Sequence, residues 1–225
     1  MNYDKNKEVL RKLYEQKGLI SNFKKDSEYL EKAFHKITKM WLSNLDQIHE
    51  VKYLMIAEAP LWGAKESYIY NPGTPNTQFF YKNDLESVLD NIAICDKRSF
   101  ITKCNEIGLL VVDISPFALN AINTIINYNR KSQNNPYGIT KSEYNQLIKE
   151  TLPFFFESKI QVIVPKISVN IKVFFRYARV KKALQSIVSD TLINNGLIQS
   201  QSDILEISNP AGGIDRYKLG SIIKV

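Results

Sequence analysis

The sequence is poor in the residues that build metal centres and disulfide-held folds. Among its 225 residues are two cysteines and two histidines, too few for a four-thiolate zinc or iron–sulfur site. Cys95 and Cys104 lie in a stretch with helical periodicity, so we expect no disulfide between them and a reducing, cytoplasmic setting. We predict neither a metal nor a cofactor.

Long apolar runs and several common enzyme motifs are also absent. No run approaches ~18 consecutive apolar residues, and the start of the chain lacks the apolar centre of a signal peptide, so we expect no membrane partner. The sequence contains no G-x-S-x-G, no G-x-x-x-x-G-K-[ST] and no G-x-G-x-x-G. The sequence therefore lacks the residues that define serine hydrolases with a nucleophile elbow, P-loop nucleotidases and Rossmann dinucleotide enzymes.

What is present is an ordinary globular composition with a basic surplus. Apolar residues make up 44% of the chain, and 30 basic residues against 23 acidic ones leave a net charge of +7. Such a surplus suits a polyanionic partner. We find no repeat, no low-complexity tract and no Gly/Ser linker, and so predict one domain over 1–225, with N-terminal helices over 1–50 and a core over 51–225.

Short apolar runs alternate with helical periodicity along the core. We predict buried strands at 51–57, 109–114, 160–164 and 204–207, and helices near 84–94, 98–106, 118–130, 140–157, 168–179 and 181–194 and from about Ile214. Two apolar stripes in the first fifty residues predict two more helices, the second capped by Asp26-Ser27. The alternation indicates an α/β three-layer sandwich, with a four-stranded parallel sheet flanked by helices.

A polar residue lies at or just past the end of each of the four predicted strands. These residues are Glu58, Asp113, Lys166 and Asn209. Because ligands bind at the carboxyl ends of the strands in open α/β sheets, we predict that Glu58, Asp113 and Asn209 converge on one cleft. Asp113 and Asn209 also fit a simpler role as caps of turns. The loop over 61–81 is longer than most loops in compact domains, and such long loops are usually functional or disordered. Its aromatic residues, with Trp62, Tyr68 and Tyr70 as the clear cases, favour an ordered, functional segment.

Four short segments, in this order, resemble motifs of the uracil-DNA glycosylase superfamily. They are Ala57-Glu58-Ala59-Pro60, Phe79-Phe80-Tyr81, Val111-Val112-Asp113-Ile114-Ser115-Pro116 and Ser208-Asn209-Pro210-Ala211-Gly212-Gly213. The resemblance covers about 51–225 and implies a DNA glycosylase. Such an enzyme cleaves the N-glycosidic bond of a flipped, modified or mismatched base, in DNA repair or in anti-phage defence. It also implies DNA as the partner, and we expect a monomer.

The resemblance implies roles for individual residues. Glu58 would orient water and stabilise the positive sugar, Asn209 would contact the reacting nucleotide, and Phe79 or Phe80 would stack on the base. Asp113 would face the base edge and Ile214 would enter the duplex as a wedge. The expected contacts to the DNA backbone are Arg216, Lys218 and Lys166. A further basic group, Arg176, Arg179, Lys181 and Lys182, fits either a solvated helix face or a DNA contact.

This chain also departs from the family pattern. Ala57 and Leu61 replace glycines of the first motif, and Asp113 replaces an Asn that recognises the base. An ionised Asp only accepts hydrogen bonds, which favours a base with an amino group, such as cytosine or a modified cytosine. A protonated Asp113 beside Glu58 would instead mimic Asn and accept uracil. The alternatives are a non-catalytic nucleic-acid-binding member of the same fold and an unrelated small-molecule hydrolase.

Overall fold

The computed structural model describes residues 1–60, 66, 68, 70–73, 96–128, 133, 135–211 and 213–223. The helix predicted near 84–94, most of the loop over 61–81, Phe79, Phe80 and Cys95 lie outside the described residues. The described strands are β1 (Val51–Ala57), β2 (Leu109–Asp113) and β3 (Ile167–Phe175). The described helices are α1 (Tyr3–Gln16), α2 (Ile20–Asp46), α4 (Lys97–Ile107), α5 (Lys141–Thr151), α6 (Phe156–Ile163), α7 (Ala178–Asn194) and α8 (Arg216–Ile222), with short 3-10 turns at Leu152–Phe154, Val164–Lys166 and Gln201–Asp203.

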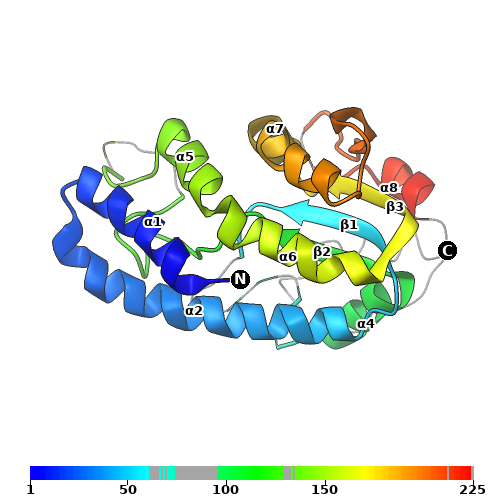
Figure 1. The fold of residues 1–225 in the computed structure, drawn as a ribbon, viewed down its shortest axis with the longest axis horizontal. Helices are drawn as coiled ribbons and strands as arrows, with labels where there is room; N and C mark the ends of the chain where they lie inside the picture. The colour runs from blue at the N-terminus through cyan, green and yellow to red at the C-terminus, as the bar shows by residue number, and fades with distance from the viewer. Residues whose placement is uncertain are drawn as a thin grey trace.

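The three strands form one parallel sheet in the order β2-β1-β3. Helices flank the sheet, as predicted for an α/β fold: in Figure 1, α2 and α4 run along one side of it and α7 and α8 along the other. Every residue of β2 is buried, and six of the seven in β1 are buried. Such continuous burial is typical of parallel strands that are covered on both faces.

β1 has its predicted boundaries, and β2 begins where predicted but ends one residue earlier, at Asp113, because both apolar runs have clear ends. β1 is followed by Glu58, and Pro60 comes two residues later. β2 begins directly after Gly108, which ends α4 with a φ of +77°. A Cβ on Gly108 would lie 2.4 Å from the Glu50 carbonyl oxygen, so this tight connection requires glycine.

The third and fourth predicted strands are wrong. The run 160–164 lies in α6 and the 3-10 turn after it, and its helix buries Phe156, Lys159, Ile160 and Ile163 at helical spacing. The helix predicted at 168–179 is instead strand β3 over most of its length, in which β-branched residues alternate with polar ones. The run 204–207 forms one isolated parallel bridge, Phe174 to Leu205. The described sheet therefore has three strands and not four.

Two helix predictions also need correction. No described residue of the segment 118–128 is helical, because Asn120 Oδ1 accepts from the backbone N–H groups of Ile122 and Asn123 and fixes a turn. Asp26 does not cap a helix. It lies inside the continuous helix α2, where its Oδ2 accepts from the Tyr14 hydroxyl and from the Ile125 N–H, each at 2.7 Å.

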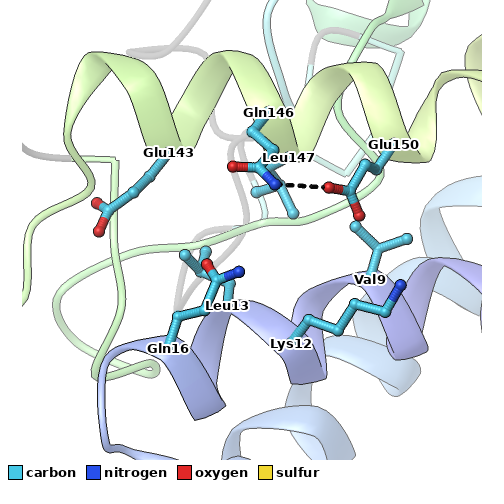
Figure 2. Close-up of a pocket in the computed structure, with 8 residues that line it drawn as sticks. All are labelled: Val9, Lys12, Leu13, Gln16, Glu143, Gln146, Leu147 and Glu150. Carbon is cyan, nitrogen blue, oxygen red and sulfur yellow. Dashed lines mark hydrogen bonds between the residues drawn. The ribbon is translucent and has the colours of Figure 1, made fainter.

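The N-terminal helices belong to the same apolar core as the sheet. Trp41 of α2 is fully buried, and its indole N–H donates to the Val111 carbonyl of β2 at 2.9 Å. Figure 2 shows α1 lying along α5, with side chains of both helices facing each other. The gap between these two helices measures about 20 Å³, which leaves space for little more than one water molecule.

No helix among the described residues is both long enough and apolar enough to span a bilayer.

Candidate active site

Charged residues gather at the carboxyl edge of the sheet, one at the end of each strand. Ala57 of β1 pairs with Asp113, the last residue of β2. Arg176 directly follows β3, and its backbone N–H donates to the Ile56 carbonyl of β1. Glu58 directly follows β1. Parallel pairing thus brings Glu58, Asp113 and Arg176 to one edge, where ligands of open α/β sheets bind.

Glu58 lies in the wall of a cleft and forms an ion pair with Arg179 of α7. Arg179 Nη2 lies 2.5 Å from Glu58 Oε2, and Nη1 lies 3.3 Å from Oε1, so one guanidinium covers both carboxylate oxygens. The Glu58 side chain is 21% exposed and the Arg179 side chain is 72% exposed. The arginine therefore approaches the carboxylate from the solvent side.

The cleft beside Glu58 has a volume of about 530 Å³, within the range of pockets that bind small organic groups. Its walls come from the end of β1, the segment before α5, the first turn of α5 and the first turns of α7. The described lining residues are Glu58, Tyr128, Ile139, Thr140, Lys141, Tyr144, Arg179, Val180, Ala183 and Leu184. The cleft thus combines one carboxylate, two cations, two phenol rings and an apolar wall.

Two tyrosines in the cleft differ in how their hydroxyl groups are used. Their rings pack edge to face, 5.5 Å apart at 85°. The Tyr128 hydroxyl is hydrogen bonded to Ser115 Oγ and donates to the Phe117 carbonyl at 3.1 Å. The buried Tyr144 hydroxyl has no partner at normal hydrogen-bond distance among the described residues, although the Glu58 carboxylate lies close enough to act on it as an acceptor. Burial, and then the nearby Tyr128 and Glu58, raise the pKa of Tyr144 well above its usual value.

Asp113 lies in a buried cluster beneath this edge and is not among the residues that line the cleft. Its side chain is 3% exposed, and its Oδ2 accepts from the Tyr70 hydroxyl at 2.8 Å. Burial raises the pKa of Asp113, while the charges of Lys159 and Arg176 and the bond from Tyr70 oppose that rise. The structure thus connects Asp113 to the core and not to the described cleft.

Lys159 is the cation that acts most strongly on Asp113. It is fully buried on α6, and its ammonium lies 4.7 Å from the ring centre of Trp41 and 4.3 Å from that of Phe155. The ammonium has no hydrogen-bond partner among the described residues. Burial lowers the pKa of Lys159 to about 8, and the charge of Asp113 acts in the opposite direction. A buried lysine over two aromatic rings is held by cation–π attraction in place of hydrogen bonds.

Asn209 does not line the cleft beside Glu58. Its side chain closes a turn: Oδ1 accepts from the Gly213 N–H at 3.1 Å, and Nδ2 donates to the Ile214 carbonyl at 3.3 Å. Ile214 is partly buried against the core. Asn209 follows a segment that pairs in parallel with β3 through the bridge Phe174–Leu205. The convergence of Glu58 and Asn209 on one cleft stays a prediction.

The basic residues predicted to contact DNA lie in different settings. Arg216 and Lys218 are exposed at the start of α8, although the Lys218 ammonium also donates to the Ser208 carbonyl at 2.8 Å. We predicted that Lys166 follows a strand, and this is wrong, because Lys166 directly precedes β3. Its ammonium donates to the carbonyls of Leu45, at 2.9 Å, and Ile48, at 2.8 Å, where α2 ends.

Sequence analysis missed several residues of this region, namely Tyr128, Tyr144, Lys141 and Lys159, and noted Tyr70 only as an aromatic residue of the loop over 61–81. Tyr144 and Lys159 carried no signal, because each occupies an ordinary position in a helical pattern. Arg179 was noted only as one of a basic group. Among the described residues, no group of three or more His, Cys, Asp or Glu side chains is placed to hold a metal ion.

Comparison of the chain with protein-family models, with curated proteins and with solved structures finds no match.

Proposed function

We propose that this protein is an N-glycosyl hydrolase that acts on a base of DNA, with Glu58 as the catalytic carboxylate. The observation that carries the proposal is the position of Glu58. It directly follows a central parallel strand, is mostly buried, and opens into a cleft walled by aromatic and apolar side chains. A carboxylate that opens into such a cleft can act on a group bound there, which supports a functional role.

The chemistry follows from that position. Breaking an N-glycosidic bond passes through an oxocarbenium-like sugar, which a nearby negative charge stabilises. In the proposed step, the oxygen of a water molecule forms a bond to C1′ and the C1′–N bond breaks, with its electron pair leaving on the base. Glu58 accepts the proton that the water releases. No redox partner is needed for this balance.

The other walls of the cleft suit a flipped nucleotide. Tyr128, Ile139, Val180 and Leu184 offer flat and apolar surface for a base that has left the stack. Arg179 and Lys141 lie at the same cleft and offer charge for phosphate groups. The net charge of +7 supports a polyanionic substrate.

The choice of base is a separate question. The preference for cytosine or a modified cytosine depended on Asp113 facing the base, and the described Asp113 carboxylate is bonded to Tyr70 inside the core. We therefore propose the type of bond that is cleaved and leave the base to experiment.

The test is incubation of the protein with single-stranded and duplex oligonucleotides that carry uracil, cytosine or modified cytosines, followed by alkali to cleave abasic sites. We expect strand breaks at one or more of these bases. Glu58→Gln removes the proton acceptor but keeps the shape, so the rate falls by about 10²- to 10⁴-fold while DNA binding remains. The absence of breaks with every oligonucleotide, or an equal rate for Glu58→Gln, would overturn the proposal.

One observation favours a second candidate, a non-catalytic DNA-binding protein. Arg179 covers both oxygens of Glu58, and in a binding protein the role of Glu58 would be to orient that arginine. DNA binding that weakens in Glu58→Gln, with no excision by the wild type, supports this candidate.

A further inference from the structure

The hydroxyl of Tyr144 is a buried polar group that no described residue meets at normal hydrogen-bond distance. The residue is 9% exposed and lines the cleft. Buried tyrosine hydroxyls normally have a partner, and leaving one without a partner destabilises the folded state. A ligand in the cleft would supply the missing partner.

Tyr144 and Glu58 line the same cleft, and the Glu58 carboxylate lies close enough to act on the Tyr144 hydroxyl. Tyr144 is in the first turn of α5, a helix that begins with a capping box between Thr140 and Glu143. Its ring packs edge to face on that of Tyr128, which limits its rotation. The charge of Glu58 is among the causes that raise the pKa of Tyr144. The phenol therefore stays protonated and presents a donor close to a carboxylate acceptor.

The neighbouring tyrosine shows the contrast. The Tyr128 hydroxyl is engaged by Ser115 Oγ and by the Phe117 carbonyl, so it is fixed within the protein. Of the two phenols that line the cleft, Tyr144 is the one whose hydroxyl has no partner at normal hydrogen-bond distance among the described residues.

We infer that Tyr144 and Glu58 bind the same oxygen atom, which is that of the attacking water. This inference rests on the proposed hydrolysis. A water molecule has two hydrogens and two lone pairs. One hydrogen is donated to Glu58, one lone pair attacks C1′, and the second lone pair accepts a hydrogen bond from Tyr144. Tyr144 keeps its proton throughout and orients the water, while Glu58 receives the proton that is released.

The experiment compares Tyr144→Phe with the wild type and with Tyr3→Phe. Tyr3 is a buried tyrosine of α1 that is not among the residues lining the cleft. Its hydroxyl donates to the Ser27 carbonyl at 2.8 Å. Three quantities are measured: the single-turnover rate of base excision, the affinity for a duplex with a tetrahydrofuran abasic analogue, and the midpoint of thermal unfolding.

For Tyr144→Phe we expect an excision rate at least about 10-fold lower, because one orienting hydrogen bond to the reacting water is lost. Affinity for the abasic duplex stays the same. The unfolding midpoint stays equal or rises, because the substitution deletes a buried hydroxyl that has no protein partner. Tyr3→Phe shows the reverse pattern, with an unchanged rate and a lower midpoint.

Four results would overturn the assignment of Tyr144. An excision rate equal to that of the wild type removes its role and leaves the glycosylase proposal intact. Weaker affinity at an unchanged rate makes Tyr144 a contact for DNA and not for water. A lower midpoint together with the lower rate makes its role structural. If the wild type excises no base from any oligonucleotide, the proposed function fails first, and the assignment of Tyr144 fails with it.

Discussion

Tyr70 donates its hydroxyl hydrogen to Asp113 Oδ2 at 2.8 Å, and both side chains are almost completely buried. Lys159 lies near enough to Asp113 for each charge to shift the pKa of the other. The end of β2 is thus joined to α6 and to the segment after β1 by one small polar cluster inside an apolar core. This cluster stabilises the edge of the sheet on which Glu58 lies.

The cluster gives a first prediction on stability. Asp113→Ala leaves the Tyr70 hydroxyl without its acceptor and Lys159 without its opposing charge, so the free energy of unfolding falls by roughly 1–3 kcal/mol. Lys159→Met is expected to cost less in the Asp113→Ala background than in the wild type, because the two charges compensate each other. Urea unfolding of the four proteins measures this coupling. Strictly additive losses would show that the two charges act independently.

Lys159 also predicts how stability depends on pH. Its pKa is lowered from 10.5 to about 8 in the folded protein. Between these two values the unfolded chain holds a proton that the folded chain has lost, so stability rises with pH across this window. The contribution is on the order of 3 kcal/mol over the full window.

The matching measurement is denaturant unfolding of the wild type and Lys159→Met at pH 7, 8.5 and 10. Taking the difference between the two proteins removes the contribution of other titrating groups. We expect the wild type to gain stability relative to Lys159→Met as the pH rises. A difference that stays constant with pH would contradict the lowered pKa.

Arg179 predicts an effect on DNA binding that is larger than its effect on stability. Its side chain is 72% exposed, so its ion pair with Glu58 contributes at most about 1 kcal/mol to folding. If Arg179 contacts a phosphate in the complex, Arg179→Ala weakens binding similarly for all sequences and reduces the salt slope by about one. Lys32→Ala, the same change of charge on the exposed face of α2, is the control. Equal salt slopes for the two variants would remove Arg179 from the DNA interface.

The variant Lys166→Met tests whether Lys166 stabilises the fold or contacts DNA. Its ammonium donates to backbone carbonyls at the end of α2. Lys166→Met should therefore lower the free energy of unfolding by about 1–3 kcal/mol and leave the salt slope of DNA binding unchanged. The role that we first predicted from sequence requires the opposite pattern, a lower slope with unchanged stability.

Strands β1 and β2 could be predicted from the sequence, because each is a short apolar run with a clear end. The error at α6 and β3 has a physical cause. The run 160–164 is apolar enough for a buried strand, but its burial follows a helical period that continues back to Phe156. In β3 the apolar residues alternate with polar ones, and most of its first half is exposed or partly exposed. A short apolar run alone does not distinguish these cases.

Glu58 could be identified from sequence because it follows a strand directly. Its ion-pair partner could not, since Arg179 lies 121 positions away and meets Glu58 only once α7 packs against β3. Tyr144 and Lys159 come from other helices, and their chemistry depends on burial, which tertiary packing alone determines. The local sequence pattern predicted where the edge of the sheet lies. The residues that line the cleft could be identified only from the three-dimensional structure.

The attachment of α2 to the sheet has a consequence for how the protein opens. Trp41 bonds to β2, and Lys166 joins the end of α2 to the start of β3. Amide protons in the middle of α2 should therefore exchange with solvent only when the sheet itself unfolds, at the rate of the slowest amides of β1. We therefore expect the first fifty residues to form one cooperative folding unit with the strands, so that their deletion removes one wall of the core on which the edge bearing Glu58 depends.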